Sequence, residues 1–333
     1  NGTVTINGGE VSKNSAKYGG GVYIDSGDFT ITGGKISGNT SSSDGEGGGV
    51  YVSGGTFTIE NDALISKNTS CGNGGGIFAN GGTITINGGS ISENIFSNNS
   101  SGGGGIYLTG TAQLTMTGGK ISNNYPEGRD LSNDTFGGGV YVSGGTFTMT
   151  GGEISNNYGF YGGGVATLGS FSMSGGTISG NIVTNSSDGS KGNGSAVAVL
   201  TGGLFTVSES ITINGDVYLF DDQTITVSNN FEGGEVMITP YRYESNDGVD
   251  VQVLEPIDGV SLTPEIVRKF EVTPQVLSGG YEYWYVTAAG MLAKDSIIYV
   301  RSGSSEDGEG TLGTLANPFK TIQAAVNSAI EKN

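Results

Sequence analysis

One seven-residue phrase, Gly-Gly-x-Ile-Ser-x-Asn, constrains the fold more than any other feature of this chain. Close copies end at Asn14, Asn39, Asn94, Asn124, Asn157 and Asn181, and a degenerate copy ends at Asn68. Successive asparagines in this series are 25, 29, 26, 30, 33 and 24 residues apart. Self-similarity at a period of roughly 20 to 50 residues is typical of solenoids and propellers, so we expect a repeat architecture.

Two further phrases recur in step with the first. The type Gly-Gly-Gly-Val-Tyr occurs at residues 19–23, 47–51, 74–78, 103–107, 137–141 and, altered, 162–166. The type Thr-Phe-Thr-Ile occurs at 29–32, 57–60, 84–87, 114–117, 147–150 and 171–174. From the Val of a Gly-Gly-Gly-Val-Tyr phrase to the Ile of the next Gly-Gly-x-Ile-Ser-x-Asn phrase, the distance stays at 13 to 15 residues. From that Ile to the Val of the following Gly-Gly-Gly-Val-Tyr phrase, the distance varies from 11 to 19 residues. Two connections are therefore constant in length and one is a variable loop.

Each phrase reads as a short strand, because apolar and polar residues alternate within it. Three strands in a repeat of about 28 residues predict an all-β fold, a right-handed parallel β-helix with three strands per coil and about 7–9 coils. A β-propeller is the rival fold, but its blades need about 40 residues and four strands.

The alternation also predicts which side chains face the interior. We expect Val22, Ile24, Phe29, Ile31 and Ile36 to point inward and their neighbours to point outward. The repeated asparagine follows the third strand, where its amide can bond to the coils above and below. The predicted asparagine ladder consists of Asn14, Asn39, Asn68, Asn94, Asn124, Asn157 and Asn181.

Composition narrows the function classes. Glycine occupies 64 of 333 positions, which disfavours helices, and it lacks the every-third-residue period of collagen. With 14 basic and 32 acidic residues, a net charge of −18, binding to nucleic acid or to an anionic membrane surface is disfavoured. The chain has no histidine and a single cysteine, Cys71, and it contains no apolar run of about 18 residues. We therefore expect no metal site, no cofactor and no membrane insertion. Because it begins Asn-Gly-Thr, we expect a processed or excised piece of something larger.

The repeat phrases fade near residue 215, and this predicts three parts. We assign residues 1–230 to the β-helix and residues 231–294, richer in Glu, Val, Tyr and Pro, to a small β-domain that covers its end. Residues 295–333 read as a strand, an acidic loop and an amphipathic helix that begins at Asn317 and Pro318. That helix places Phe319, Ile322, Val326, Ala329 and Ile330 on one face.

These motifs resemble known β-helix families. The repeats are similar to those of Gly-rich, pectate-lyase-like surface proteins of bacteria, and the pairing of Gly-Gly-Val-Tyr with Ile-Ser-x-Asn is similar to the repeats of chlamydial polymorphic outer-membrane proteins. The run Tyr-Val-x-x-Gly with Asn-Pro-Phe-x-Thr-Ile-Gln-x-Ala, near the C-terminus, resembles the start of pectate-lyase-like domains, where a strand and helix cover the first coil. The resemblance implies the fold but no single function, because such helices serve as adhesins, stalks and enzymes alike.

The capping sequence thus stands at the end of the chain, while residue 1 opens in mid-coil. Either the chain is a window of a tandem array, or residues 295–333 of one copy cover the first coil of the next. The second arrangement is a heterologous contact, which does not close and produces a filament. The expected partner is the protein itself, with glycans as a further candidate.

Catalysis is disfavoured by the outward positions of the Val-Tyr strands. These are Tyr23 and Asp25, Tyr51 and Ser53, Phe78 and Asn80, Tyr107 and Thr109, and Tyr141 and Ser143. Only one of them is acidic, whereas polysaccharide-cleaving β-helices need clustered carboxylates. We therefore expect no enzyme, and a carbohydrate-binding or carbohydrate-cleaving β-helix remains the alternative.

Three surface patterns admit two interpretations each. The aromatic column Tyr23, Tyr51, Phe78, Tyr107 and Tyr141 either stabilises its sheet by stacking, which we favour, or forms a platform for a sugar chain. Outward Thr-x-Thr pairs resemble ice-binding proteins, but threonine is an ordinary strand residue. Acidic loops such as Asp44-Gly45-Glu46 either are simply solvated, which we favour, or bind calcium. Together these observations predict an extracellular structural rod at a cell surface, as part of a filament, stalk or adhesin.

Overall fold

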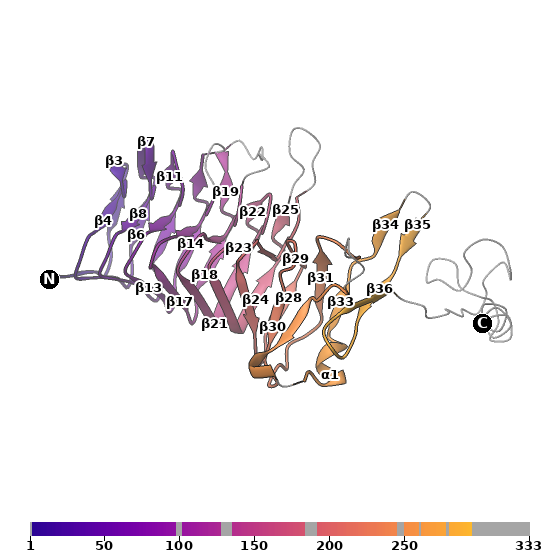
Figure 1. Cartoon of the computed structure of the whole chain (residues 1–333). Coiled ribbons are helices and arrows are strands. Elements are labelled where there is room, and N and C mark those ends of the chain that lie inside the picture. The colour runs from indigo at the N-terminus through magenta and orange to yellow at the C-terminus, as the bar shows by residue number, and fades with distance from the viewer. Residues whose placement is uncertain are drawn as a thin grey trace, which may run out of the picture. The chain divides into compact units, whose positions relative to one another are not determined.

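The structure is a computed structural model that describes residues 2–97, 102–127, 135–183, 192–244, 250–259, 261–277 and 280–294. Nearly all of its pairing is between parallel strands, and short strands from successive repeats stack into long ladders (Figure 1). The prediction of an all-β, parallel β-helix is confirmed. Within the described ranges the chain divides into two compact units, one of residues 2–272 and 286–292, the other of residues 273–285 with Ala293 and Lys294.

The Val-Tyr ladder is built from the second sequence phrase. Its parallel strands in order are β4 (Val22–Ile24), β8 (Val50–Val52), β12 (Ile77–Ala79), β16 (Ile106–Leu108), β20 (Val140–Val142), β23 (Val165–Thr167), β26 (Val197–Val199), β29 (Asp216–Leu219), β31 (Val236–Pro240) and β33 (Phe270–Val272).

The threonine ladder is built from the third phrase. Its parallel strands in order are β1 (Thr3–Ile6), β5 (Asp28–Ile31), β9 (Thr56–Ile59), β13 (Thr83–Ile86), β17 (Gln113–Met116), β21 (Thr146–Ser155), β24 (Ser170–Ser179), β27 (Leu204–Val207), β30 (Ile225–Val227) and β32 (Leu254–Pro256).

The Ile-Ser ladder is built from the first phrase. Its parallel strands in order are β2 (Glu10–Ser12), β6 (Lys35–Ser37), β10 (Leu64–Ser66), β14 (Ser90–Ser92), β18 (Lys120–Ser122), the far halves of β21 and β24, and β28 (Thr212–Asn214). It joins the threonine ladder where β21 and β24 run continuously through the corner.

A fourth, short ladder follows the repeated asparagine, and the sequence phrases do not predict it. It comprises β3 (Ser15–Tyr18), β7 (Thr40–Glu46), β11 (Thr69–Ser70), β15 (Ile95–Phe96) and β19 (Tyr125–Pro126), with a separate pair formed by β22 (Tyr158–Gly159) and β25 (Ile182–Val183). The connection of variable length that leads from the repeated asparagine back to the Val-Tyr ladder therefore begins with a short strand that pairs with the same segment of neighbouring coils.

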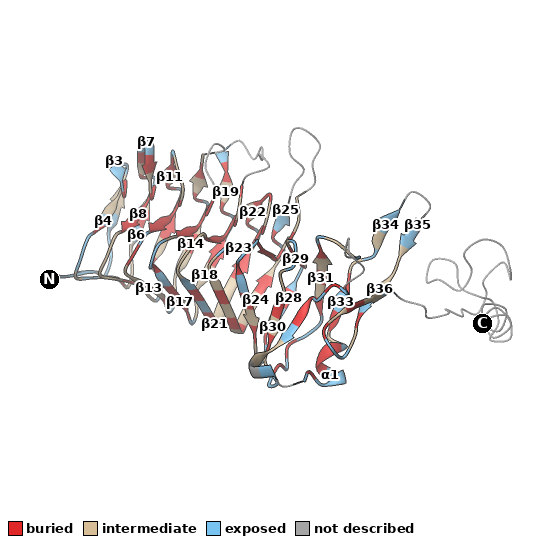
Figure 2. Cartoon of the chain, in the orientation of Figure 1, coloured by how far each residue is buried: buried red, intermediate tan, exposed pale blue. Residues whose placement is uncertain are grey.

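Inward-facing side chains stack in register to form the core. Ile36, Ile65, Ile91, Ile121, Ile154 and Ile178 follow one another along the Ile-Ser ladder, and all are fully buried. On the threonine ladder, the rings of Phe147 and Phe171 stack at 4.7 Å and those of Phe171 and Phe205 at 5.0 Å. The interior is therefore a series of apolar columns parallel to the coil axis. Figure 2 shows that the strands of successive coils carry buried residues.

Parallel pairing continues past residue 230, where the sequence predicted a separate β-domain. β31 and β33 extend the Val-Tyr ladder and β32 extends the threonine ladder. A 3-10 turn (Ile257–Gly259) and the short helix α1 (Pro264–Val267) lie within these last coils. The boundary missed these strands because β32 and β33 follow no Gly-Gly pair, and the Gly233-Gly234 pair before β31 leads into neither a Val-Tyr nor an Ile-Ser phrase.

The second unit contains the antiparallel pair β34 (Gln275–Leu277) and β35 (Gly280–Glu282). β36 (Trp284–Val286) and β37 (Leu292–Lys294) span the division between the units. The predicted cap, residues 295–333 with Phe319, Ile322, Val326 and Ile330, lies outside the described residues.

Candidate functional site

The seven repeated asparagines form a continuous hydrogen-bonded ladder. Asn68 donates its backbone N–H and its Nδ2 to Oδ1 of Asn94, at 3.1 and 3.0 Å, and the same two bonds join every neighbouring pair from Asn14 to Asn181. The second Nδ2 hydrogen of Asn68 goes to the carbonyl of Ile36 at 3.0 Å. The five asparagines from Asn39 to Asn157 are completely buried, so these bonds are made away from water.

The residue before each ladder asparagine turns the chain into the left-handed region. Lys13, Lys67, Glu93, Asn123 and Asn156 have φ between 55° and 57°. Glycine takes this position before Asn39 and Asn181. Such a conformation costs a residue with a Cβ about 1–2 kcal/mol. The sequence analysis missed this corner, although a phrase position shared by Gly, Asn and charged residues is a signal for it.

Two corner glycines show why the Gly-Gly-Gly phrase is needed. At Gly47, φ is 68° and an added Cβ would lie 2.4 Å from the carbonyl oxygen of Val50. At Gly49 an added Cβ would lie 2.8 Å from Nδ2 of Asn68. The phrase therefore lets the backbone pass close beside the asparagine ladder.

The predicted aromatic column is present on the Val-Tyr ladder, but most of it is covered. Its rings contact in series at centroid distances of 5.0 to 5.2 Å. Tyr51, Phe78, Tyr107 and Tyr141 are 3 to 8 % exposed, and only Tyr23 is open, at 52 %. The outward direction predicted from alternation does not give a free surface, because these rings belong to a second apolar cluster outside the coil interior. Four of the five rings are therefore closed to a sugar chain.

The aromatic array extends beyond the five predicted rings. Ala166 and Ala198 continue the column in register, and Phe136 and Tyr161 pack against this part of the cluster. Ring contacts run from Tyr141 to Phe136 (5.3 Å), from there to Tyr161 (5.6 Å), and on to Phe220 (4.9 Å). Phe136 and Tyr161 each directly precede a Gly-Gly-Gly-Val phrase or its altered copy, and that placement is the signal the sequence analysis did not use.

Burial shifts the ionisation of groups in this cluster. It raises the pKa of Tyr141 to about 12 and raises the pKa of Tyr51 and Tyr107. Burial also raises the pKa of the Glu46 carboxyl, while a hydrogen bond from Asn73, at 3.3 Å, acts in the opposite direction. The Glu46 carboxyl is therefore partly desolvated, and its charge contributes to the raised pKa of Tyr51.

The first coil is the most open part of the parallel ladders (Figure 2). β1, β2, β3 and β4 each pair with a strand on one side only. Val4, Tyr18 and Tyr23 are 50 %, 41 % and 52 % exposed. In the columns of Val4 and Tyr23, Phe57 two coils further on and Tyr51 one coil further on are buried. The Oδ1 of Asn14 accepts no hydrogen bond within the described residues, unlike that of every later ladder asparagine. This edge therefore presents unpaired backbone N–H and C=O groups, exposed apolar side chains and one free hydrogen-bond acceptor of the asparagine ladder.

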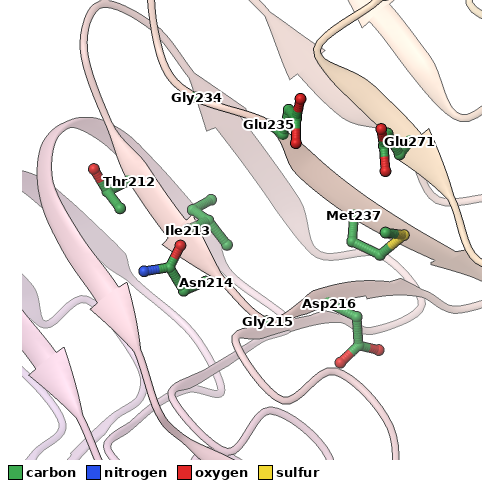
Figure 3. A pocket seen from close by; sticks show the side chains of 9 residues that line it. All are labelled: Thr212, Ile213, Asn214, Gly215, Asp216, Gly234, Glu235, Met237 and Glu271. Atoms are coloured by element: carbon green, nitrogen blue, oxygen red, sulfur yellow. The ribbon is translucent and has the colours of Figure 1, made fainter.

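A pocket of about 750 Å³ lies beside β28, where the Ile-Ser ladder ends. Glu235 and Glu271 lie near each other on one side, and Asp216 lies apart from them, beyond Met237 (Figure 3). Asp216 is already engaged, because it accepts hydrogen bonds from the backbone N–H and the hydroxyl of Ser195 at 2.7 and 2.6 Å. The pocket offers carboxylate acceptors to hydroxyl groups or cations, and no basic residue lines it.

Chemistry-bearing groups remain scattered over the part of the chain that the structure describes. No group of three His, Cys, Asp or Glu side chains there could hold a metal ion. Arg242 pairs with the exposed Asp222, and Arg268 ends α1. The described helices include none with the length and apolar character needed to cross a bilayer.

No protein-family model, no curated protein and no solved structure matches the chain.

Proposed function

We propose that this protein is a structural subunit of an extracellular rod, such as a surface filament, stalk or adhesin, that assembles head to tail. In this proposal residues 295–333 of one copy cap the first coil of the next. The extracellular location is part of the proposal and rests on the resemblance of the repeats to bacterial surface proteins.

The open first coil carries this proposal. Its strands leave N–H and C=O groups unpaired along one edge, which is a template for strand addition. The half-exposed Val4 and Tyr23 add apolar surface at the same edge. Burying such groups against a capping strand and helix would replace their contact with water, which favours association.

The sequence of residues 295–333 provides matching chemistry. Ile297-Ile298-Tyr299-Val300 has the composition of a strand, and Phe319, Ile322 and Val326 share one face of the predicted helix. An amphipathic helix of this kind requires an apolar partner surface. The exposed interior of a first coil is such a surface.

The buried asparagine ladder supports a mechanical role. Its bonds run parallel to the coil axis and link each coil to the next independently of the sheet hydrogen bonds. Fully satisfied buried polar networks are rigid, so this arrangement suits a rod that carries load along its axis.

Sedimentation velocity over a range of concentrations tests the proposal. We expect the intact chain to form species larger than a monomer, and I322D/V326D to remove them. N327D/S328D adds the same charge to the polar face of the predicted helix and should leave assembly unchanged. V4D, on the first coil, should act like I322D/V326D. An intact chain that stays monomeric at every concentration would contradict the proposal.

A further inference from the structure

A straight column of hydroxyl groups runs along the outer face of the threonine ladder. Direct register partners place one Thr or Ser at the same position in each successive strand. The column consists of Thr5, Thr30, Thr58, Thr85, Thr115, Thr148, Ser172, Thr206 and Thr226. All are partly or fully exposed, and within the described strands none of their hydroxyls bonds to another side chain.

Charge is nearly absent from this face although the chain carries a net −18. Among the outward positions of the threonine-ladder strands, only Asp28 in β5 and Glu255 in β32, the last strand, are charged, and Glu60 directly follows β9. The Ile-Ser ladder, in contrast, presents Glu10, Lys35, Lys120 and Glu153. Two copies of an acidic protein repel each other least where both surfaces are neutral.

We propose that this face, the threonine face, binds the same face of a second copy, side by side and in antiparallel orientation. The inference concerns lateral pairing and does not depend on head-to-tail assembly. The second copy presents the same strand spacing of about 4.8 Å along its whole length, so methyl and hydroxyl groups can interdigitate at every strand, as in paired sheets of identical segments.

The size of the threonine face suits a stable pair. Nine strands about 4.8 Å apart, with two outward columns about 7 Å apart, give roughly 600 Å² per copy, or about 1,200 Å² for the pair, which is the lower end of the range for specific interfaces. Leu204, on the same face, is 59 % exposed and would gain an apolar partner. Stiff threonine χ1 angles keep the entropy cost of the contact low.

The positions of the three carboxylates on or beside this face select the antiparallel orientation. Asp28 and Glu60 lie in the first coils and Glu255 lies in the last strand, so a parallel pair would set each carboxylate against the same carboxylate of the second copy. With the nine strands from β1 to β30 aligned, an antiparallel pair sets Asp28 and Glu60 against the uncharged strands β27 and β24 and leaves Glu255 beyond the contact. A twofold axis relates the two copies in that arrangement, so the contact closes at a pair.

Mass per unit length of the intact chain, measured by small-angle X-ray scattering, tests this pairing, because end-to-end assembly leaves that quantity unchanged. We expect the wild type to have twice the mass per length of T85K/T115K. S90K/T177K places the same charges on the Ile-Ser ladder and should stay paired. T85V/T115V keeps strand propensity and shape, and it too should stay paired.

Circular dichroism confirms that each variant is folded. A wild-type mass per length equal to that of T85K/T115K would overturn the proposal. Thermal hysteresis, or retention on an insoluble polysaccharide, that T85K/T115K abolishes while the wild type remains a single rod would assign the face to ice or to glycan instead, and would equally overturn it.

Discussion

Asn68 gives both its backbone N–H and its side-chain amide to a single oxygen, Oδ1 of Asn94, one coil away. The same oxygen position recurs in each coil from Asn39 to Asn181, so one buried acceptor per coil receives two donors. Loss of one asparagine therefore disturbs both neighbouring coils.

Replacing Asn94 with Ala should destabilise the protein by about 3–5 kcal/mol, because two buried donors of Asn68 and the carbonyl of Ile65 lose their partner at about 1–3 kcal/mol each. The urea midpoint of unfolding measures the effect. Asn87→Ala removes an exposed asparagine that directly follows β13 and should cost less than about 1 kcal/mol. Equal, small losses in both variants would contradict the structural role of the ladder.

Glu93→Gly should stabilise the protein by about 0.5–1 kcal/mol, because glycine relieves the strain of φ = 57° at this corner and loses part of that gain to backbone entropy. Glu93→Gln is the matched control. It keeps the strained backbone and removes only the exposed ion pair with Lys67, at 3.7 Å, so its stability should stay within about 0.5 kcal/mol of the wild type. Thermal melts of the three proteins decide the outcome. A melting temperature that falls in the glycine variant would refute the strain argument.

Glu46→Gln should stabilise the protein at neutral pH and have less effect in acid. Burial raises the pKa of the Glu46 carboxyl in the folded state, so the folded state holds this proton more tightly than the unfolded state does. The stability associated with that proton is present below the unfolded pKa and is lost as the pH rises through the folded pKa. Urea unfolding of both proteins at several pH values gives the difference. A gain that is constant with pH, or larger in acid, would be inconsistent with desolvation.

Tyr141 should stay protonated up to about pH 12 in the folded protein, because burial raises its pKa to about that value. The unfolded chain ionises its tyrosines near the ordinary value of about 10. Stability associated with the Tyr141 proton is therefore complete below about pH 10 and is lost as the pH rises toward 12. The tyrosinate absorbance and the unfolding free energy should show that Tyr141→Phe loses less stability than the wild type between neutral and alkaline pH. An identical alkaline loss in both proteins would argue that this ring is open to water.

Sequence periodicity predicted the stacked strands well because each phrase encodes a local alternation that every coil repeats. The apolar columns such as Ile65, Ile91 and Ile121 follow directly from that alternation. Residues after 230 do not show the repeat pattern, because β33 follows no Gly-Gly pair and the Gly233-Gly234 pair before β31 leads into neither a Val-Tyr nor an Ile-Ser phrase. Parallel pairing between segments that are distant in the sequence produces no local sequence pattern by which the strands could be recognised.

The aromatic column shows a second limit of sequence reasoning. Alternation determines that Tyr51 and Tyr107 point away from the coil interior, but their exposure depends on what packs over them. Phe136 and Tyr161 come from the variable returns, whose lengths differ from coil to coil. The contacts of such segments depend on tertiary packing, so the burial of the aromatic column by these residues could not be predicted from the sequence.

Electron microscopy of the intact, purified chain tests head-to-tail assembly most directly. The account predicts unbranched filaments in which each subunit follows the last along the coil axis, and it predicts that V4D gives short particles under the same conditions. Uniform short particles of the wild-type chain, with the dimensions of one subunit at concentrations where the proposal requires filaments, would contradict it.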